Sequence, residues 1–200
     1  MTFSRYLFIV VFFVTLGYGF ASTNCTAIVQ LANDLGIQVA QPLIWSALQT
    51  DCCIASGVTC VGQNVSKIDW HGMGLNGIIN DTAIPSTVTV LDLHSYSLNG
   101  NFPISLPSKL TFLDVSHNTL TNNLPPMFPV GLLTLHVHDN KLSGDLPFFP
   151  SKTKDIILGW PGSPRNNHFT GTLRSNRPIL MYINDNWITN IIIQDNMILH

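Results

Sequence analysis

Histidine and aspartate recur in this chain at a spacing of two residues. The pairs that share this spacing, with serine replacing one histidine, are Asp69 with His71, Asp92 with His94, Asp114 with Ser116, and His136 with His138. Residues i and i+2 of an extended strand lie on the same face, so each pair can share a hydrogen bond, a proton or a metal ion. Polar binding, metal ligation and proton transfer are therefore the chemistries to consider.

Each pair lies inside a repeated apolar pattern, in which two apolar residues flank the first member of the pair. Met73, Tyr96, Asn118 and Asn140 occupy one aligned position, at successive intervals of 23, 22 and 22 residues. Gly or Leu-Pro follows and turns the chain. One such repeat cannot bury its own apolar edge, whereas stacked repeats bury it between them. The pattern predicts a right-handed α/β solenoid with one parallel sheet on its concave face.

The array is expected to cover residues 63–200 in about six coils, of which the last two are irregular. Ile156 and Leu158 resemble a strand, but the following Asn167 comes late, so residues 160–164 are expected to form an extra loop. Met181 and Ile183 begin the last copy. No closing cysteine pair or polar cap follows, and a solenoid needs a polar terminal cap. We therefore expect a truncated product, with an open end that pairs with a partner as the alternative.

The outward positions of the stacked strands form columns, and these columns are the predicted binding surface. The predicted ligand-binding residues are Asp69, His71, Asp92, His94, Asp114, Ser116, His136, His138, Trp160 and Tyr182. Their side chains can hydrogen-bond a peptide, a glycan or a protein surface, and the two aromatic rings can stack on apolar groups. The alternative is that the Asp residues are ordinary solvated residues of the repeat. The histidines also suggest binding that depends on pH between 5 and 8.

A metal site or an active site is not expected on such a surface. Histidine and aspartate on adjacent strands lie close enough to share an ion, but an exposed sheet offers no closed pocket and no oriented base. The chain has no G-x-S-x-G, H-E-x-x-H or phosphate-binding glycine motif. We therefore predict a protein that is not an enzyme and that has no metal and no cofactor.

Composition and the first residues point to export. Residues 1–21 combine one positive charge, an unbroken apolar run and small residues, which is typical of a cleaved signal peptide, with an uncut signal anchor as the alternative. No later apolar run is long enough to span a membrane. Charged residues make up 10% of the chain, the net charge is -2, and no Lys/Arg run occurs, so nucleic acid is not an expected partner. A secreted location is predicted.

Four cysteines and three glycosylation sequons fit an exported chain. Cys25, Cys52, Cys53 and Cys60 allow three pairings, of which the one that joins the neighbours Cys52 and Cys53 is strained. A zinc site is a weaker alternative, because the spacing lacks a C-x2-C knuckle. The sequons, which predict glycosylation, begin at Asn24, Asn64 and Asn80.

These motifs resemble the plant-type leucine-rich-repeat family, whose repeat is L-x-x-L-x-L-x-x-N-x-L-x-G-x-L-P. The resemblance covers residues 65–173, and residues 45–60 are similar to the family's N-terminal cap, W…DCC-x-W-x-G-V-x-C. It implies helices near residues 26–35 and 43–48, within a cap that spans residues 22–62. It also implies the disulfides Cys25–Cys52 and Cys53–Cys60. The chain departs from the family at the second cap Trp, and at Met73 and Tyr96, which replace the repeat Asn.

The resemblance implies a secreted recognition module that binds an extracellular protein, peptide or glycan through the concave face. Two alternatives remain. One is an inhibitor of a secreted cell-wall glycosidase, because similar caps and repeats occur in polygalacturonase-inhibiting proteins. The other is the truncated ectodomain of a membrane receptor. The sequence does not predict an oligomeric state.

Overall fold

A computed structural model of the chain describes residues 23–94, 97–163, 167–175, 180–184 and 186–193. The predicted signal peptide lies outside these residues. Three α-helices and a short 3-10 helix form the N-terminal end: α2 (Thr23–Asp34), α3 (Ile37–Ala40), α4 (Pro42–Thr50) and η1 (Cys52–Ile54). The strands and one further 3-10 helix follow: β1 (Val58–Val61), β2 (Asn64–Asp69), η2 (Asp81–Ala83), β3 (Val90–Asp92), β4 (Phe112–Asp114), β5 (Thr134–His136), β6 (Ser143–Asp145), β7 (Asp155–Gly159), β8 (His168–Thr170), β9 (Thr172–Ser175), β10 (Leu180–Ile183) and β11 (Asn190–Ile193).

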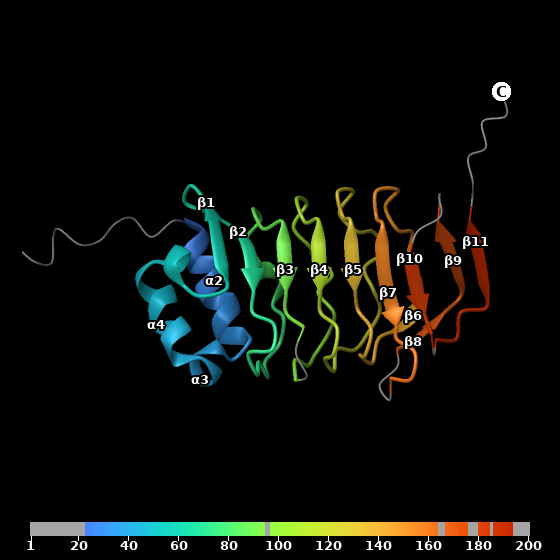
Figure 1. The fold of residues 1–200 in the computed structure, drawn as a ribbon, viewed down its shortest axis with the longest axis horizontal. Coiled ribbons are helices and arrows are strands. Elements are labelled where there is room, and N and C mark those ends of the chain that lie inside the picture. Colours follow the sequence, from blue (N-terminus) through green and yellow to red (C-terminus); the bar gives the residue numbers. More distant parts are fainter. Residues whose placement is uncertain (1–22, 95–96, 164–166, 176–179, 185, 194–200) are drawn as a thin grey trace, which may run out of the picture.

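The strands stack in one row to form a solenoid, with the helices at one end (Figure 1). The main sheet has the order β1-β2-β3-β4-β5-β7-β10, in which β1 pairs antiparallel with β2 and every later pair is parallel. Backbone bonds of 2.8 Å also join each coil to the next, as from Thr111 N to Thr89 O and from Leu133 N to Thr111 O. The predicted parallel solenoid is therefore confirmed.

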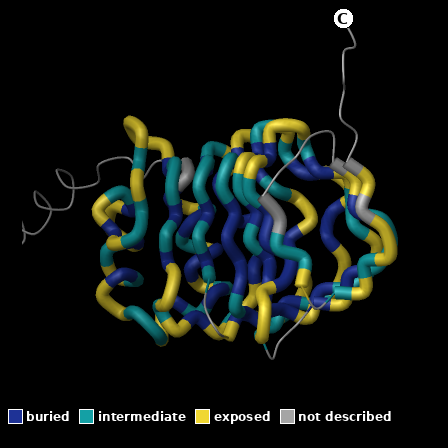
Figure 2. Tube along the Cα trace, turned by 45° about the vertical axis from the view of Figure 1, so that its right-hand side comes forward, coloured by how far each residue is buried: buried dark blue, intermediate teal, exposed yellow. Residues whose placement is uncertain are grey.

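The interior is a continuous column of apolar side chains. Leu91, Leu113, Leu135 and Ile156 are partners in adjacent strands and are fully buried. Figure 2 shows buried backbone along the strands, whereas the turns above and below are exposed. Full burial of one such side chain contributes about 1.5–3 kcal/mol, so stability comes from the stack and not from any single coil.

Buried asparagines hold the turns after the strands. In Asn140, Oδ1 accepts a 2.9 Å hydrogen bond from Leu120 N, and Nδ2 donates to three carbonyl oxygens, those of Val115, Val137 and His138. Asn118 makes the equivalent bonds one coil earlier. Because both residues are 1% exposed, these amides satisfy backbone groups that water cannot reach.

The N-terminal cap covers the first coil. Ile28 and Leu31 of α2 are fully buried in the same core as the repeat residues. The disulfides are Cys25–Cys52 and Cys53–Cys60, as the resemblance implied, so these cysteines do not form the alternative zinc site. The expected helices are present, and α3 is an addition that the sequence pattern did not predict.

Two further two-stranded sheets lie outside the main sheet. There β6 pairs with β8 and β9 pairs with β11, both in parallel. The expected extra loop begins with a turn at Pro161 and Gly162, and its final residue lies outside the described residues. Within the described part of the chain, none of the helices has the length and apolar character needed to cross a membrane.

Candidate functional site

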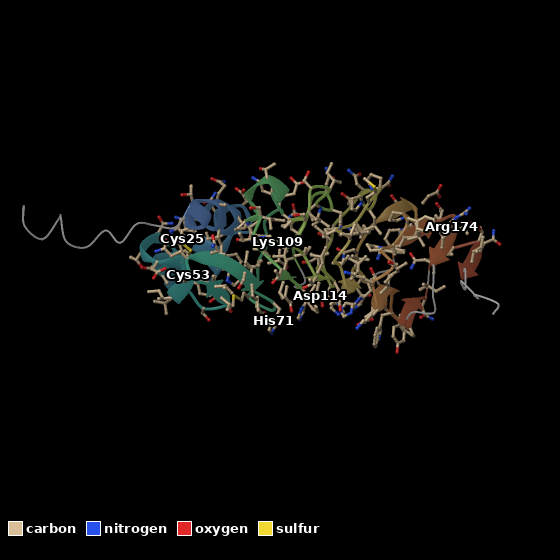
Figure 3. All side chains as sticks on the ribbon, turned by 90° about the horizontal axis from the view of Figure 1, so that it is seen from above. Cys25, Cys53, His71, Lys109, Asp114 and Arg174 are labelled. Atoms are coloured by element: carbon tan, nitrogen blue, oxygen red, sulfur yellow. A yellow bond between two sulfur atoms is a disulfide. The ribbon has the colours of Figure 1, made fainter. Side chains whose placement is uncertain are left out.

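The candidate site is the outward face of the parallel sheet, which we call the sheet face. Its central column consists of residues that the strand register places side by side, namely Asp69, Asp92, Asp114, His136, Ile157 and Tyr182. Figure 3 shows that His71 and Asp114 lie along the same side of the solenoid, while Cys25 and Cys53 mark the cap end.

The ten predicted site residues differ strongly in exposure. His71 and Trp160 are exposed, whereas Asp69, Asp92, His94, His136 and Tyr182 are half-buried. Asp114, Ser116 and His138 are buried, at 9%, 2% and 7% exposure. The middle of the sheet face is therefore less exposed than His71 at one end and Trp160 at the other.

At the cap end, each histidine is paired with an aspartate of its own coil. His71 Nδ1 bonds Asp69 Oδ1, and His94 Nδ1 lies 2.7 Å from Asp92 Oδ1. The His71 and His94 rings stack at 4.7 Å between centroids. The hydrogen bond to Asp69 raises the pKa of His71. Burial acts to raise the pKa of Asp69. The hydrogen bonds from Lys67 and His71 have the larger combined effect, so the pKa of Asp69 is lowered.

Further along, His136 bridges two carboxylates. Its Nδ1 lies 3.2 Å from Asp114 Oδ2 and its Nε2 lies 3.0 Å from Asp155 Oδ2. Burial acts to lower the pKa of His136, but the two aspartates outweigh it and raise the pKa. Asp114 also accepts hydrogen bonds from Ser116 N at 2.9 Å and Ser116 Oγ at 2.6 Å. Burial acts to raise its pKa, yet these bonds and His136 lower it.

His138 has very different surroundings. Burial and the nearby His117 lower the pKa of His138 to about 4, so the ring is neutral at physiological pH. His117 meets it edge to face at 4.7 Å, and His117 Nδ1 lies 2.7 Å from Asp139 Oδ2. His117 and Asp139 have φ values of 54° and 55°, close to the 64° of Gly72 at the same position of the first coil. This backbone conformation therefore belongs to the repeat.

Aromatic rings continue the sheet face beyond His138. Trp160 lies 5.7 Å from His138 and 5.2 Å from Tyr182, measured between ring centroids. Trp160 is 44% exposed, so its ring is available to a ligand. The structure thus brings the predicted polar columns and the two predicted aromatics into one continuous surface.

The residues predicted from the sequence did not include three side chains that belong to this surface. Asp155 contacts His136, while His117 and Asp139 contact each other beside His138. The signal that could have indicated His117 and Asp139 was their position directly before the repeat Asn, next to the predicted columns. Asp155 precedes the apolar part of its strand, so the repeat pattern gave no reason to choose it.

The predicted glycosylation sites have different local geometry. Asn64 is exposed at the start of β2. Asn80 Nδ2 donates a 2.8 Å hydrogen bond to Asp34 Oδ2, and Asn80 Oδ1 caps η2 through Thr82 N. The side chain of Asn24 lies outside the described residues.

Comparison with known proteins identifies the fold. No family model matches the chain, and no curated protein matches it either. Solved structures do match: the ectodomain of the receptor kinase SOBIR1 from Arabidopsis thaliana has a TM-score of 0.66 at 18% identity, over 84% of this chain and 96% of that one. The chain has the leucine-rich-repeat fold.

Two further structures from the same plant agree. The leucine-rich-repeat ectodomain of GASSHO1/SCHENGEN3, solved in complex with Casparian Strip Integrity Factor 2, has a TM-score of 0.64 at 23% identity. That match covers 82% of this chain but 21% of the ectodomain, so the chain spans about a fifth of its length. A BIR3–SERK2 complex gives a TM-score of 0.59 at 23% identity, over 83% of this chain and 93% of that one.

Proposed function

We propose that this chain is an extracellular recognition module that binds a protein or peptide through the sheet face and performs no catalysis. The observation that carries the proposal is the continuity of that face. Hydrogen-bonding side chains of the first four coils lead directly to the exposed Trp160 and to Tyr182. Polar groups that fix orientation beside aromatic rings that supply contact area are typical of protein-binding surfaces.

Charge on the sheet face indicates the kind of ligand. Asp69, Asp92 and Asp114 lie on the successive strands β2, β3 and β4, and Asp155 lies on β7, on the far side of β5. Complementary potentials favour a segment with Lys or Arg residues, followed by an apolar or aromatic residue that contacts Trp160. The complexes of GASSHO1 and of BIR3 with SERK2 support a binding role for this fold.

A peptide library displayed on phage tests the proposal. The folded chain should enrich peptides that combine basic and aromatic residues. Replacement of Trp160 by Ala, or of the half-buried Asp92 by Asn, should abolish or greatly weaken their binding. Met127→Ala is the matched control, because Met127 is 80% exposed and lies outside the main sheet. Enriched peptides that bind the Trp160 and Asp92 variants as well as the parent chain would refute the proposal.

Export, glycosylation at the three sequons, glycan binding, and the inhibitor and truncated-receptor alternatives remain predictions from the sequence. Two intact disulfides support an extracellular location, since disulfides persist in oxidising compartments.

A further inference from the structure

Three side chains in the middle of the sheet face form a compact group of metal-ligand types. His117, His138 and Asp139 each offer one donor atom, and these three atoms all lie within 4.8 Å of one another. Donors around a tetrahedral zinc ion at 2.0–2.1 Å lie about 3.4 Å apart. Small side-chain rotations are therefore enough to bring the three donors to one ion.

Two atoms of this group are buried without a hydrogen-bond partner. His138 Nδ1 and Asp139 Oδ1 contact no hydrogen-bonding group among the described residues, although neither atom is accessible to solvent. A buried polar atom without a partner costs about 1–3 kcal/mol, so native structures rarely keep one unless an ion or a water molecule satisfies it. Among the described residues, two of the three buried side-chain atoms without a partner thus belong to this group, and the third is Asp155 Oδ1.

The donor types of the group suit a metal ion. Imidazole nitrogens and carboxylate oxygens both bind divalent transition-metal ions, and the group offers two of the first and one of the second. His117 has a side chain that is 30% exposed, compared with 11% for Asp139, so the ion can enter from its side.

We propose that His117, His138 and Asp139 bind one divalent transition-metal ion, with Zn²⁺ as the ion best suited to this donor set. Two imidazoles and one carboxylate match the three protein ligands of open zinc sites, in which the fourth position holds water or an external ligand. Imidazole ligands favour Zn²⁺, Cu²⁺ or Ni²⁺ over Mg²⁺ and Ca²⁺, which prefer oxygen ligands. This site stands independently of the proposed peptide binding.

A second group of two histidines and one aspartate lies nearer the cap, but its histidines already have hydrogen-bond partners. His71, Asp92 and His94 also place donors within 4.8 Å of one another. Each of these histidines is already hydrogen-bonded to the aspartate of its own coil, and His71 is 54% exposed at its side chain. No atom of this group is both buried and unpaired among the described residues. We therefore assign the metal to the His117 group.

Calorimetric titration of the chelator-treated chain with Zn²⁺ at pH 7.5 tests the assignment. One equivalent should bind, and His138→Gln and Asp139→Asn should each weaken binding by at least roughly 10-fold, since even the loss of an outer-shell partner costs 10–100-fold. His168→Gln is the control, because His168 is an exposed histidine on β8, which is not part of the main sheet. His94→Gln distinguishes the two groups and should retain binding.

Cobalt provides a second readout that does not depend on the stability of the variants. Co²⁺ bound to the parent chain should give the visible absorption of a tetrahedral site, and excess Zn²⁺ should remove it. Circular dichroism shows whether each variant is folded. Absence of stoichiometric Zn²⁺ binding by the parent chain overturns the proposal. Equal binding by the folded His138 and Asp139 variants, or a loss seen only in His94→Gln, overturns it as well.

Discussion

His71 and His94 in the first two coils lie on the same sheet face as His117 and His138 in the next two, but their surroundings differ. His71 and His94 are each paired with a carboxylate and are exposed and half-buried, respectively, whereas His138 is buried with one nitrogen unpaired. The residue before the repeat Asn position accounts for part of this difference. It is Gly72 in the first coil, which has no side chain to cover the strand, but His117 and Asp139 in the later coils. Neighbouring turns thus determine the burial of a residue on a flat sheet.

The largest expected effect concerns the turns themselves. Asn140→Ala leaves Leu120 N without its partner and removes one of two hydrogen bonds to each of three carbonyl oxygens, so we expect a loss of about 3 kcal/mol in the free energy of unfolding. Met73→Ala at the same repeat position should cost less, about 1–2 kcal/mol, because only apolar contacts are lost. Urea denaturation measures both. Equal losses would show that the buried amide is not what holds the later turns.

The next effect tests the burial of His138. Its folded pKa of about 4 lies below the ordinary 6.5, so the unfolded chain takes up the proton first and stability falls as pH decreases through this range. We expect His138 to account for a loss of about 2 kcal/mol between pH 7 and pH 5. Denaturation of His138→Phe in the presence of chelator should lack this loss. If His138→Phe loses as much stability between pH 7 and pH 5 as the parent chain does, the buried His138 is not the cause of the loss.

His136 should show the opposite dependence on pH. Its folded pKa is raised, so its stabilising contribution is complete below about pH 6.5 and is lost as pH rises through the folded value. At pH 6, His136→Gln should destabilise the chain by about 1–2 kcal/mol, because the charged hydrogen bonds to Asp114 and Asp155 are lost. The difference from the parent chain should shrink at higher pH. A difference that grows with pH would contradict the bridging role.

The smallest effect is expected at the cap end. His71 has a side chain that is 54% exposed, and exposed ion pairs contribute little to stability. His71→Ala should therefore change the free energy of unfolding by no more than about 0.5 kcal/mol in urea at pH 7. A larger loss would mean that the stacked His71 and His94 rings stabilise the first coils.

The strand register was predictable because it depends on apolar periodicity alone. Leu91, Leu113 and Leu135 must all face inward, and that choice fixes which neighbours face outward. How far each outward-facing side chain is buried was not predictable in the same way. Asp114 and Asp92 have equivalent positions, yet Asp114 is more buried because His136, Ser116 and their neighbours pack around it. Such contacts depend on side chains from several coils at once.

The two-stranded sheets outside the main sheet, and α3, were also not predictable from the apolar pattern. Gly144 and Phe169 pair between β6 and β8 in a separate sheet, through backbone hydrogen bonds that the apolar repeat pattern does not encode. Ile37–Ala40 is too short for an apolar period to be recognised. The disulfides, in contrast, followed from the similarity of residues 45–60 to a known cap.

Cross-linking is unevenly distributed along the solenoid. Each repeat coil is held to its neighbours by hydrogen bonds and packing, whereas the cap also carries two covalent links. Rupture under a pulling force, or the opening that admits a protease, should therefore begin among the repeats and advance towards the cap. The repeats should thus resist unfolding less than the cap does. A ligand that binds several coils at once would hold those coils together and slow their unfolding.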